Sequence, residues 1–250
     1  MTPGFVCIPA IKFMYTYLPA VNTDHNDKRD KSIRQLIKKI KLNCLTHFTH
    51  MDNLKSILRF GILPASILCR NKTFENITRH NGKLPPEWES FVSLNISFPD
   101  YKLFSDLNNH MPSDWVILLI DPKALTDFPC YFFPHRALDI INNAPMPRLF
   151  LPEFQKYSDF KALFSDREDI KRSDLNIPAF YTTDPTSEVL SAFPIGPSYI
   201  THVYFHSDYK FNQWVLHNTE FAMTQDRNRW AVGLEYFSPR SDYPFWKTRR

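Results

Sequence analysis

One glutamate is placed where a reacting carboxylate is useful. Glu188 follows a Pro-Thr-Ser turn at 185–187 and precedes the apolar pair at 189–190, which predicts a carboxylate at the start of a short strand. Such a group can stabilise positive charge that develops on a substrate, or accept a proton from an attacking atom. A solvent-facing glutamate on an edge strand fits the same pattern, so the spacing alone leaves both interpretations open.

Two polar side chains lie on one face of a predicted strand over 44–49. His47 and Thr49 are two residues apart, and side chains at that spacing in a strand point the same way. They are candidate ligand contacts, and a hydrogen-bonded core histidine is the alternative. A metal site built on His47 and His50 is disfavoured, because the two side chains face opposite ways and no third ligand follows at a supporting spacing. No metal site is therefore expected.

The glycine and cysteine content excludes several classes of protein. The five glycines lie at positions 4, 61, 82, 196 and 233, too far apart for a dinucleotide fingerprint or a phosphate-binding loop. Rossmann dehydrogenases, kinases and P-loop NTPases are therefore poor candidates. The predicted helix N-terminus at 52–54 offers another kind of anion site. The four cysteines contain no C-x-x-C pair, which argues against a zinc ribbon or a disulfide framework.

The charge of the chain is mildly basic, with a formal net charge of +4. Seven Lys or Arg side chains and one acid lie between Lys28 and Lys41, on a predicted helix whose apolar stripe is at 33, 36, 37 and 40. The basic face is either a solvated helix surface or a phosphate-contacting one. The composition is thus compatible with a polyanionic partner.

The order of predicted elements indicates an α+β fold with a largely antiparallel or split sheet. Alternation predicts a half-buried strand at 91–98, and the apolar run Trp115–Ile120 predicts a strand buried on both faces. A helix after 52 is expected to have Asp52 as its N-cap and Gly61 as its C-cap. Further helices are predicted at 136–143 and 157–170, strands at 180–183, 188–190 and 199–206, and a loop at 69–90.

The domain organisation is predicted to be simple. The apolar first twenty residues lack a basic start and are interrupted by prolines, unlike a signal peptide, and residues 20–31 are polar and linker-like. Residues 1–30 are therefore expected to be a poorly ordered leader, and 31–250 a single domain. No window has the ~18 apolar residues of a membrane span, so we expect a cytoplasmic monomer that does not contact membranes.

Five blocks of the chain, in this order, carry a resemblance to a known family. They are Leu45–Leu63 (LTHFTHMDNLKSILRFGIL), Phe91–Phe104 (FVSLNISFPDYKLF), Trp115–Pro122, Phe160–Val203 (with TTDPTSEVL) and Tyr236–Trp246 (YFSPRSDYPFW). Together they resemble the DarT family, the toxin halves of DarT–DarG toxin–antitoxin pairs. The resemblance is nearer to the guanine-directed branch than to the thymine-directed one.

The resemblance implies a fold, a reaction and partners. The fold would be an ADP-ribosyltransferase-like α+β domain over 31–250, with a split, mostly antiparallel sheet and flanking helices. The enzyme would be an NAD-dependent mono-ADP-ribosyltransferase that consumes NAD, needs no metal and modifies a base, guanine before thymine, in single-stranded DNA. It would act as a toxin opposed by a DarG-like macrodomain antitoxin. Transfer to RNA or protein, or an inactive nucleic-acid-binding relative, are the alternatives.

The resemblance also assigns roles to residues. It implies Glu188 as the catalytic carboxylate, with assistance from Arg79, for which Arg70 is a competitor. The implied NAD contacts are His47, Thr49, Asn53 and Tyr101, and the nucleic-acid contacts are Lys171, Arg172 and Arg240. Helix capping by Asn53, a core role for Tyr101 and ordinary solvation of the loop arginines are the structural alternatives.

Several positions depart from the family pattern. Asp100 stands where Asn is expected, Ser187 where Ala is expected, and Arg136 and Leu138 occupy an expected Asn-Ala-Ala stretch. These departures bear on the substrate rather than on the type of reaction.

Overall fold

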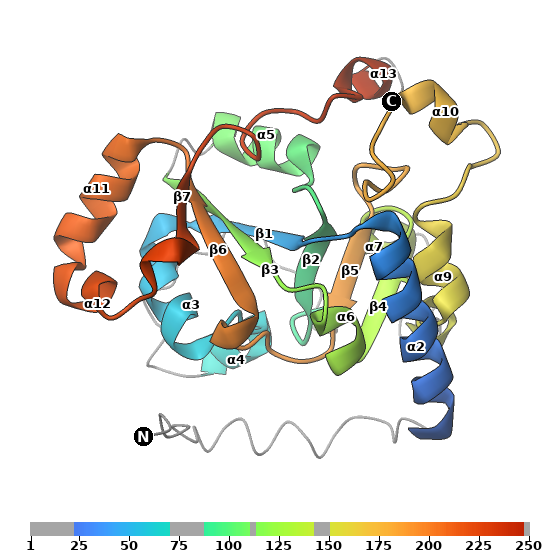
Figure 1. Ribbon diagram of the computed structural model, residues 1–250, viewed down its shortest axis with the longest axis horizontal. Helices are drawn as coiled ribbons and strands as arrows, with labels where there is room; N and C mark the ends of the chain where they lie inside the picture. The colour runs from blue at the N-terminus through green and yellow to red at the C-terminus, as the bar shows by residue number, and fades with distance from the viewer. Residues whose placement is uncertain (1–22, 71–87, 111–113, 143–150, 248–250) are drawn as a thin grey trace.

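A seven-stranded sheet forms the centre of the computed structural model, which describes residues 23–70, 88–110, 114–142 and 151–247. The strand order is β4-β5-β2-β1-β3-β6-β7 (Figure 1). All neighbours are antiparallel except β6 and β7, which are parallel. The mostly antiparallel α+β architecture predicted from the sequence is confirmed. The strands are β1 (Leu45–His50), β2 (Val92–Ile96), β3 (Trp115–Ile120), β4 (Cys130–Phe133), β5 (Glu188–Ser191), β6 (Ile200–Phe205) and β7 (Trp230–Val232).

The two central strands of the sheet, β1 and β2, pair over only two residues each. Strand β1 pairs with β3 along all six of its residues, but it pairs with β2 only through Leu45 with Ile96 and Thr46 with Asn95. Beyond Thr46 no backbone pair joins the two strands. The sheet therefore consists of two halves, β4-β5-β2 and β1-β3-β6-β7, connected at one end.

Helices cover both faces of the sheet (Figure 1). The α-helices are α2 (Thr23–Ile40), α3 (Leu54–Phe60), α4 (Ala65–Arg70), α5 (Tyr101–His110), α6 (Ala124–Asp127), α7 (Ala137–Asn142), α9 (Tyr157–Ala162), α10 (Arg172–Leu175), α11 (Asp208–His217), α12 (Thr219–Met223) and α13 (Tyr243–Lys247). Short 3-10 turns are η1 (Met51–Asn53), η3 (Leu151–Phe154), η4 (Pro197–Tyr199) and η5 (Arg227–Arg229). None of the helices in the described ranges is long and apolar enough to cross a membrane.

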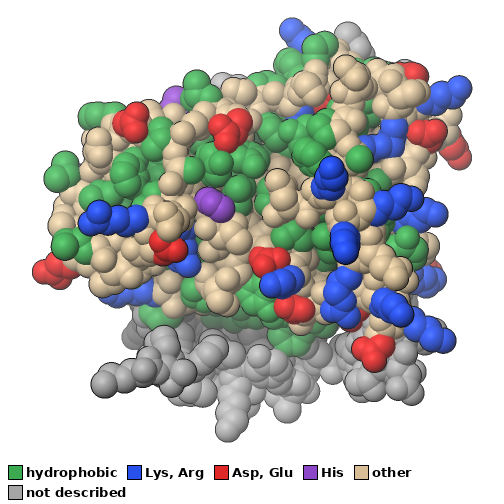
Figure 2. Space-filling view, in the orientation of Figure 1, with side chains coloured by type: hydrophobic (Ala, Val, Ile, Leu, Met, Phe, Trp, Pro, Cys, Tyr) green, Lys and Arg blue, Asp and Glu red, His purple; other side chains and the backbone are tan. Residues whose placement is uncertain are grey.

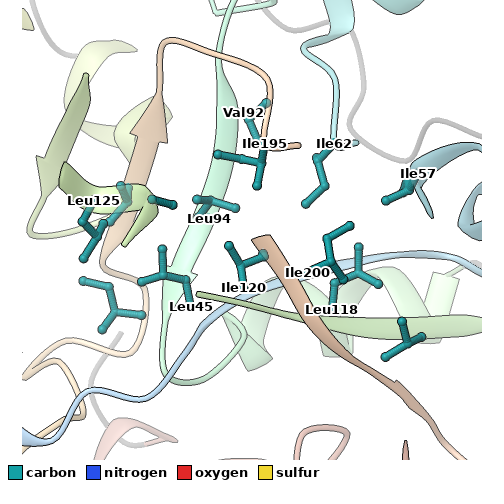
Figure 3. Close-up of a cluster of buried hydrophobic side chains, with 14 of the residues drawn as sticks. Leu45, Ile57, Ile62, Val92, Leu94, Leu118, Ile120, Leu125, Ile195 and Ile200 are labelled. Atoms are coloured by element: carbon teal, nitrogen blue, oxygen red, sulfur yellow. The ribbon is translucent and has the colours of Figure 1, made fainter. Parts of the chain in front are cut away.

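The main hydrophobic core lies between one face of the sheet and helices α2, α3, α9 and α11. Alternate residues of the central strands point into it, as the two-residue period of a strand requires. A second cluster on the other face packs Phe104 of α5 against Trp115 and Ile117 of β3. Strand β3 is thus buried on both faces, as its apolar sequence predicts. Figure 3 shows the main cluster, with Leu45, Ile57, Ile62, Val92, Leu94, Leu118, Ile120, Leu125, Ile195 and Ile200 labelled.

Some predicted elements differ from the observed ones. Helix α2 begins at Thr23, so the polar residues from there to 31 are helical rather than a linker. The helix predicted over 157–170 ends at Ala162. The segment 180–183 is not a strand, because its carbonyl groups accept hydrogen bonds from arginine side chains instead of a neighbouring strand. Strand β2 is covered on both faces, not half-buried, since Asn95 on its polar side is 8% exposed.

The helix after β1 is capped differently from the prediction. Asp52 lies inside the turn η1, and the N-cap position of α3 is Asn53, which makes no side-chain cap hydrogen bond. The C-cap at Gly61 is confirmed, with φ of 88°. A Cβ atom on Gly61 would lie 2.3 Å from the carbonyl oxygen of Ile195, so both its backbone angle and its close contact need glycine.

The end of α2 carries a lysine where glycine is usual. Lys41 has φ of 58°, and the amide of Leu42 donates to the carbonyl of Ile37 over 3.0 Å, the arrangement of a Schellman C-cap. A side chain with a Cβ is disfavoured in this left-handed region by about 1 kcal/mol.

We expect Lys41→Gly to raise the free energy of unfolding by about 1 kcal/mol, because the substitution relieves the left-handed backbone strain. Chemical denaturation measures this. Lys39→Gly, two residues earlier inside the helix, should lower the free energy of unfolding by about 1 kcal/mol. A loss of stability in both variants would show that Lys41 is not strained.

Candidate active site

Glu188 is the first residue of β5, which lies between β4 and β2. The interpretation as a solvent-facing glutamate on an edge strand is therefore wrong. One carboxylate oxygen accepts a short hydrogen bond from the hydroxyl of Ser93, and the other accepts from the backbone amide of Ala137 over 2.7 Å. The carboxylate is held by two neutral donors from two different elements.

Ser93 also connects this carboxylate to His47. Nδ1 of His47 lies 3.0 Å from the carbonyl oxygen of Ser93. Since a carbonyl only accepts, Nδ1 carries the proton. Burial lowers the pKa of His47, so the ring is neutral and its Nε2 is an acceptor. A single residue of β2 therefore joins Glu188 to the strand across the opening of the sheet.

The electrostatic setting of Glu188 combines opposing influences. Burial raises the pKa of this carboxyl, and the hydrogen bonds from Ser93 and Ala137 oppose the rise. The charge of Asp100 also raises the pKa, and that of Arg136 lowers it. Glu188 itself forms no ion pair with the cations of the described ranges. It is a hydrogen-bonded carboxylate whose charge is not neutralised by direct contact.

Two departures from the family pattern contact each other beside Glu188. Nε of Arg136 donates to Oδ2 of Asp100 over 2.5 Å. The other oxygen of Asp100 accepts from the amides of Lys102 and Leu103, each over 3.1 Å, and so caps α5. The two residues form one unit, although they lie 36 positions apart.

A second cluster fixes the turn before Glu188. Oδ2 of Asp184 lies 2.9 Å from Nδ1 of His135 and 2.7 Å from a guanidinium nitrogen of Arg167. Its other oxygen accepts from the amide and hydroxyl of Thr186. Burial would raise the pKa of Asp184, but the bonds from His135 and Thr186 outweigh burial and lower it to about 2. The cluster ties the 184–187 turn to the segment that supplies Ala137.

Two of the predicted nucleic-acid contacts are engaged within the chain. Arg172 donates to the carbonyls of Tyr181 and Pro178, over 2.9 and 3.1 Å. Arg240 is 3% exposed and donates to Asp242 and to the carbonyl of Thr182. Because the guanidinium groups of Arg172 and Arg240 donate to acceptors within the chain, their geometry favours a role in holding the segment that leads to Glu188. Lys171, the third residue of this group, is exposed.

The remaining predicted residues lie in several environments. The side-chain amide of Asn53 donates to the hydroxyl of Thr49 over 3.1 Å, and both residues are buried. Tyr101 is 4% exposed, with its ring against Tyr243. Arg79 lies outside the described residues, and for Arg70 only the backbone is described. Their predicted roles stay predictions.

Two buried hydroxyls near the site lack hydrogen-bond partners within the described ranges. They belong to Tyr101 and Thr46. Thr46 pairs with Asn95, which in turn pairs with Glu188. Buried hydroxyls without a partner are costly, which marks both as places where a polar partner is missing.

The described residues were compared with the arrangement that a metal ion needs. No group of three or more His, Cys, Asp or Glu side chains among the described residues is arranged to hold a metal ion. Nδ1 of His50 accepts from the amide of Asp52, on the other side of the strand from His47.

Comparison with known proteins gives distant structural similarity. No protein-family model matches the chain, and a search of curated proteins finds no match. DarT of Thermus sp. 2.9 in complex with NAD+ is 18% identical over 78% of this chain and 97% of its own, with a TM-score of 0.46. The same protein in complex with ADP-ribosylated ssDNA gives 15% identity, coverage of 78% and 96%, and a TM-score of 0.47.

A third solved structure is similar at the same level. DarTG of Thermosipho africanus in complex with ADP-ribose is 16% identical over 76% of this chain and 49% of its own, with a TM-score of 0.45. These values are too low to assign the chain to a family.

We expect Asp184→Asn to lower the free energy of unfolding by about 2 kcal/mol at neutral pH, because the folded state holds the pKa of this carboxyl below its value of 3.8 in a model compound. The stabilisation is present above the unfolded-state pKa and is lost as pH falls towards 2. The difference between wild type and variant should therefore shrink between about pH 4 and pH 2.

Denaturation at several pH values measures this difference. Asp106→Asn, at an exposed position of α5, is the matched control and should change stability little. A difference between wild type and Asp184→Asn that is independent of pH would contradict the role assigned to the charge.

Proposed function

We propose that this chain is an NAD-dependent mono-ADP-ribosyltransferase that modifies a base in single-stranded DNA. The observation that carries the proposal is the connection from Glu188 through Ser93 to His47, at the point where β1 and β2 stop pairing. These two hydrogen bonds connect a carboxylate to an imidazole across the gap in the sheet, which supports the proposal. The ordered sequence blocks that resemble the DarT family support the same reaction.

The chemistry suits a single carboxylate. Transfer breaks the bond between the nicotinamide nitrogen and ribose C1′, so positive charge develops on the ribose as a neutral leaving group departs. A fixed negative charge stabilises that state more than the ground state. Glu188 is held in place by Ser93 and Ala137 and forms no ion pair within the described residues, and it can also accept the proton from an attacking base nitrogen.

The residues present fit NAD as a co-substrate. The hydroxyls of Tyr101 and Thr46 are buried without a partner among the described residues, and Nε2 of His47 is an acceptor for a ribose hydroxyl. Glu188 is connected to His47 through the hydroxyl and the carbonyl of Ser93. These groups bind by hydrogen bonds, which agrees with the lack of a glycine-rich phosphate loop in the sequence.

The substrate and the biological role extend the proposal. A base is reached by an enzyme only when it is unpaired or flipped out, which favours a single strand. We assign guanine before thymine and a toxin role, opposed by a DarG-like macrodomain antitoxin, on the sequence resemblance. The enzyme is a cytoplasmic monomer in this proposal, with its catalytic domain over 31–250 and no metal requirement.

Incubation with labelled NAD and oligonucleotides tests the proposal. Mass spectrometry should find one ADP-ribose on a DNA base. Label on RNA or protein alone would replace the DNA assignment, and no transfer to any acceptor would refute the enzyme assignment.

Glu188→Gln should lower the rate of transfer at least about 100-fold, because it removes the charge that stabilises the developing cation while keeping the shape of the side chain. The measurement is initial rate with saturating NAD, together with thermal unfolding to confirm the fold. Glu220→Gln, at an exposed position of α12, should leave the rate unchanged. Full activity in Glu188→Gln would remove Glu188 from the mechanism.

The pair of Asp100 and Arg136 should set the pH range of activity. Arg136 lowers the pKa of Glu188 and Asp100 raises it, and the ionised carboxylate is the active form. Arg136→Gln should therefore move the acid limb of the pH–rate profile to higher pH, and Arg136→Lys should largely restore it.

Asp100→Asn removes the charge that raises the pKa of Glu188. It should therefore move the acid limb to lower pH, opposite to the effect of Arg136→Gln. Identical acid limbs in wild type, Arg136→Gln and Asp100→Asn would show that these charges do not act on Glu188.

A further inference from the structure

The outward face of α2 carries a line of cations. Lys31, Arg34, Lys38 and Lys41 are all exposed, and Lys and Arg side chains gather over this part of the molecule in Figure 2. At about 100° per residue Lys31, Arg34 and Lys38 fall within an arc of about 60° and rise about 10 Å along the helix. Lys41 follows directly after the last residue of α2, so the four cations form one file rather than a scattered set.

The opposite face of the same helix is fixed in the core. Ile33 is fully buried, and Leu36, Ile37 and Ile40 pack against the same cluster. The helix therefore has no apolar face to offer a lipid bilayer, which membrane-surface helices need. Its orientation is set, and the file of cations points outward.

The positive charge of this file is compensated only at its beginning, where Asp27 and Asp30 lie one helical turn before Lys31 and Arg34 and the charge of Arg34 lowers the pKa of Asp30. Residues 31–41 contain no acid. Within the described part of the chain, α2 makes one ion pair, between Arg29 and Asp30, and Arg34 contacts the hydroxyl of Thr126 over 3.4 Å. Such a file attracts a chain of negative charges with similar spacing, as in a nucleic-acid backbone.

The file ends near the backbone of Glu188, but on the other face of the sheet from its carboxylate. Leu45, four residues after Lys41, pairs with Ile96, and the neighbouring Asn95 pairs with Glu188. Since adjacent strands lie about 5 Å apart, the backbones of Leu45 and Glu188 are roughly two strand spacings apart. Helix α2 packs on the face that carries Leu45 and Val189, whereas the carboxylate of Glu188 accepts from Ala137 on the opposite face. The other end of the helix is anchored by Arg29, which donates to the carbonyl of Gln155 over 2.6 Å.

We infer that the file Lys31–Arg34–Lys38–Lys41 binds the sugar-phosphate backbone of a single-stranded DNA substrate. This inference rests on the proposed function for the identity of the strand. Contacts to phosphates position a strand and carry no sequence information. The file therefore supplies affinity and orientation, and the selection of the base is left to the region around Glu188.

The test is the salt dependence of binding to a labelled 20-nucleotide single strand, measured without NAD. The triple variant Lys31→Gln, Arg34→Gln and Lys38→Gln should bind at least about 10-fold more weakly at low salt. Its slope of log affinity against log salt should be reduced by about 2, since each lost phosphate contact contributes about 0.7 on single strands. Lys55→Gln, Arg59→Gln and Arg227→Gln, combined on α3 and η5, form the matched control and should bind like wild type.

Lys41→Gly adds a second readout. It should weaken binding while raising the melting temperature, a combination that a merely structural role for this lysine does not give. Unchanged affinity and slope in the triple variant, or an equal loss in the control, would overturn the inference. If wild type binds DNA through this file but transfers no ADP-ribose to it, the inference stands and the proposed function fails.

Discussion

The candidate site depends on the two hydrogen bonds made by Ser93. Its hydroxyl donates to Glu188 and its carbonyl accepts from His47, at a place where the backbone ladder between β1 and β2 has stopped. A strand end without a partner leaves polar groups that must be satisfied in another way. Here a histidine side chain takes the place of the missing backbone partner, and the two halves of the sheet stay in register.

Much of the surrounding structure holds the segments that meet at this point. Asp184 joins the turn before Glu188 to His135, and Arg172 and Arg240 satisfy the carbonyls of the preceding segment. Buried charged groups of this kind are tolerated only when they are paired and hydrogen-bonded. The arginines thus replace a sheet ladder, and the segment that carries the carboxylate is fixed without regular secondary structure.

The sequence predicts the parts that periodicity and motif control. Burial of Trp115–Ile120 on both faces, the C-cap at Gly61 and the strand that starts at Glu188 all follow from local pattern. Ser93, Ala137 and the partners of Asp184 could not be predicted, because their roles arise from register between distant segments. The same limit explains the wrong strand at 180–183, whose carbonyls accept hydrogen bonds from the side chains of Arg172 and Arg240. The contact between Asp100 and Arg136 had one signal, since both residues depart from the family pattern.

Ser93 makes its two hydrogen bonds with different parts of the residue, and this has an evolutionary consequence. Its link to the imidazole belongs to the main chain, whereas its link to the carboxylate belongs to the side chain. Replacing the serine by alanine would therefore leave the acid with only the amide of Ala137 as a donor, while the histidine ring stays oriented as before. The two roles of Ser93 can therefore be separated by mutation. A substitution at this position can impair the carboxylate while the histidine keeps its orientation.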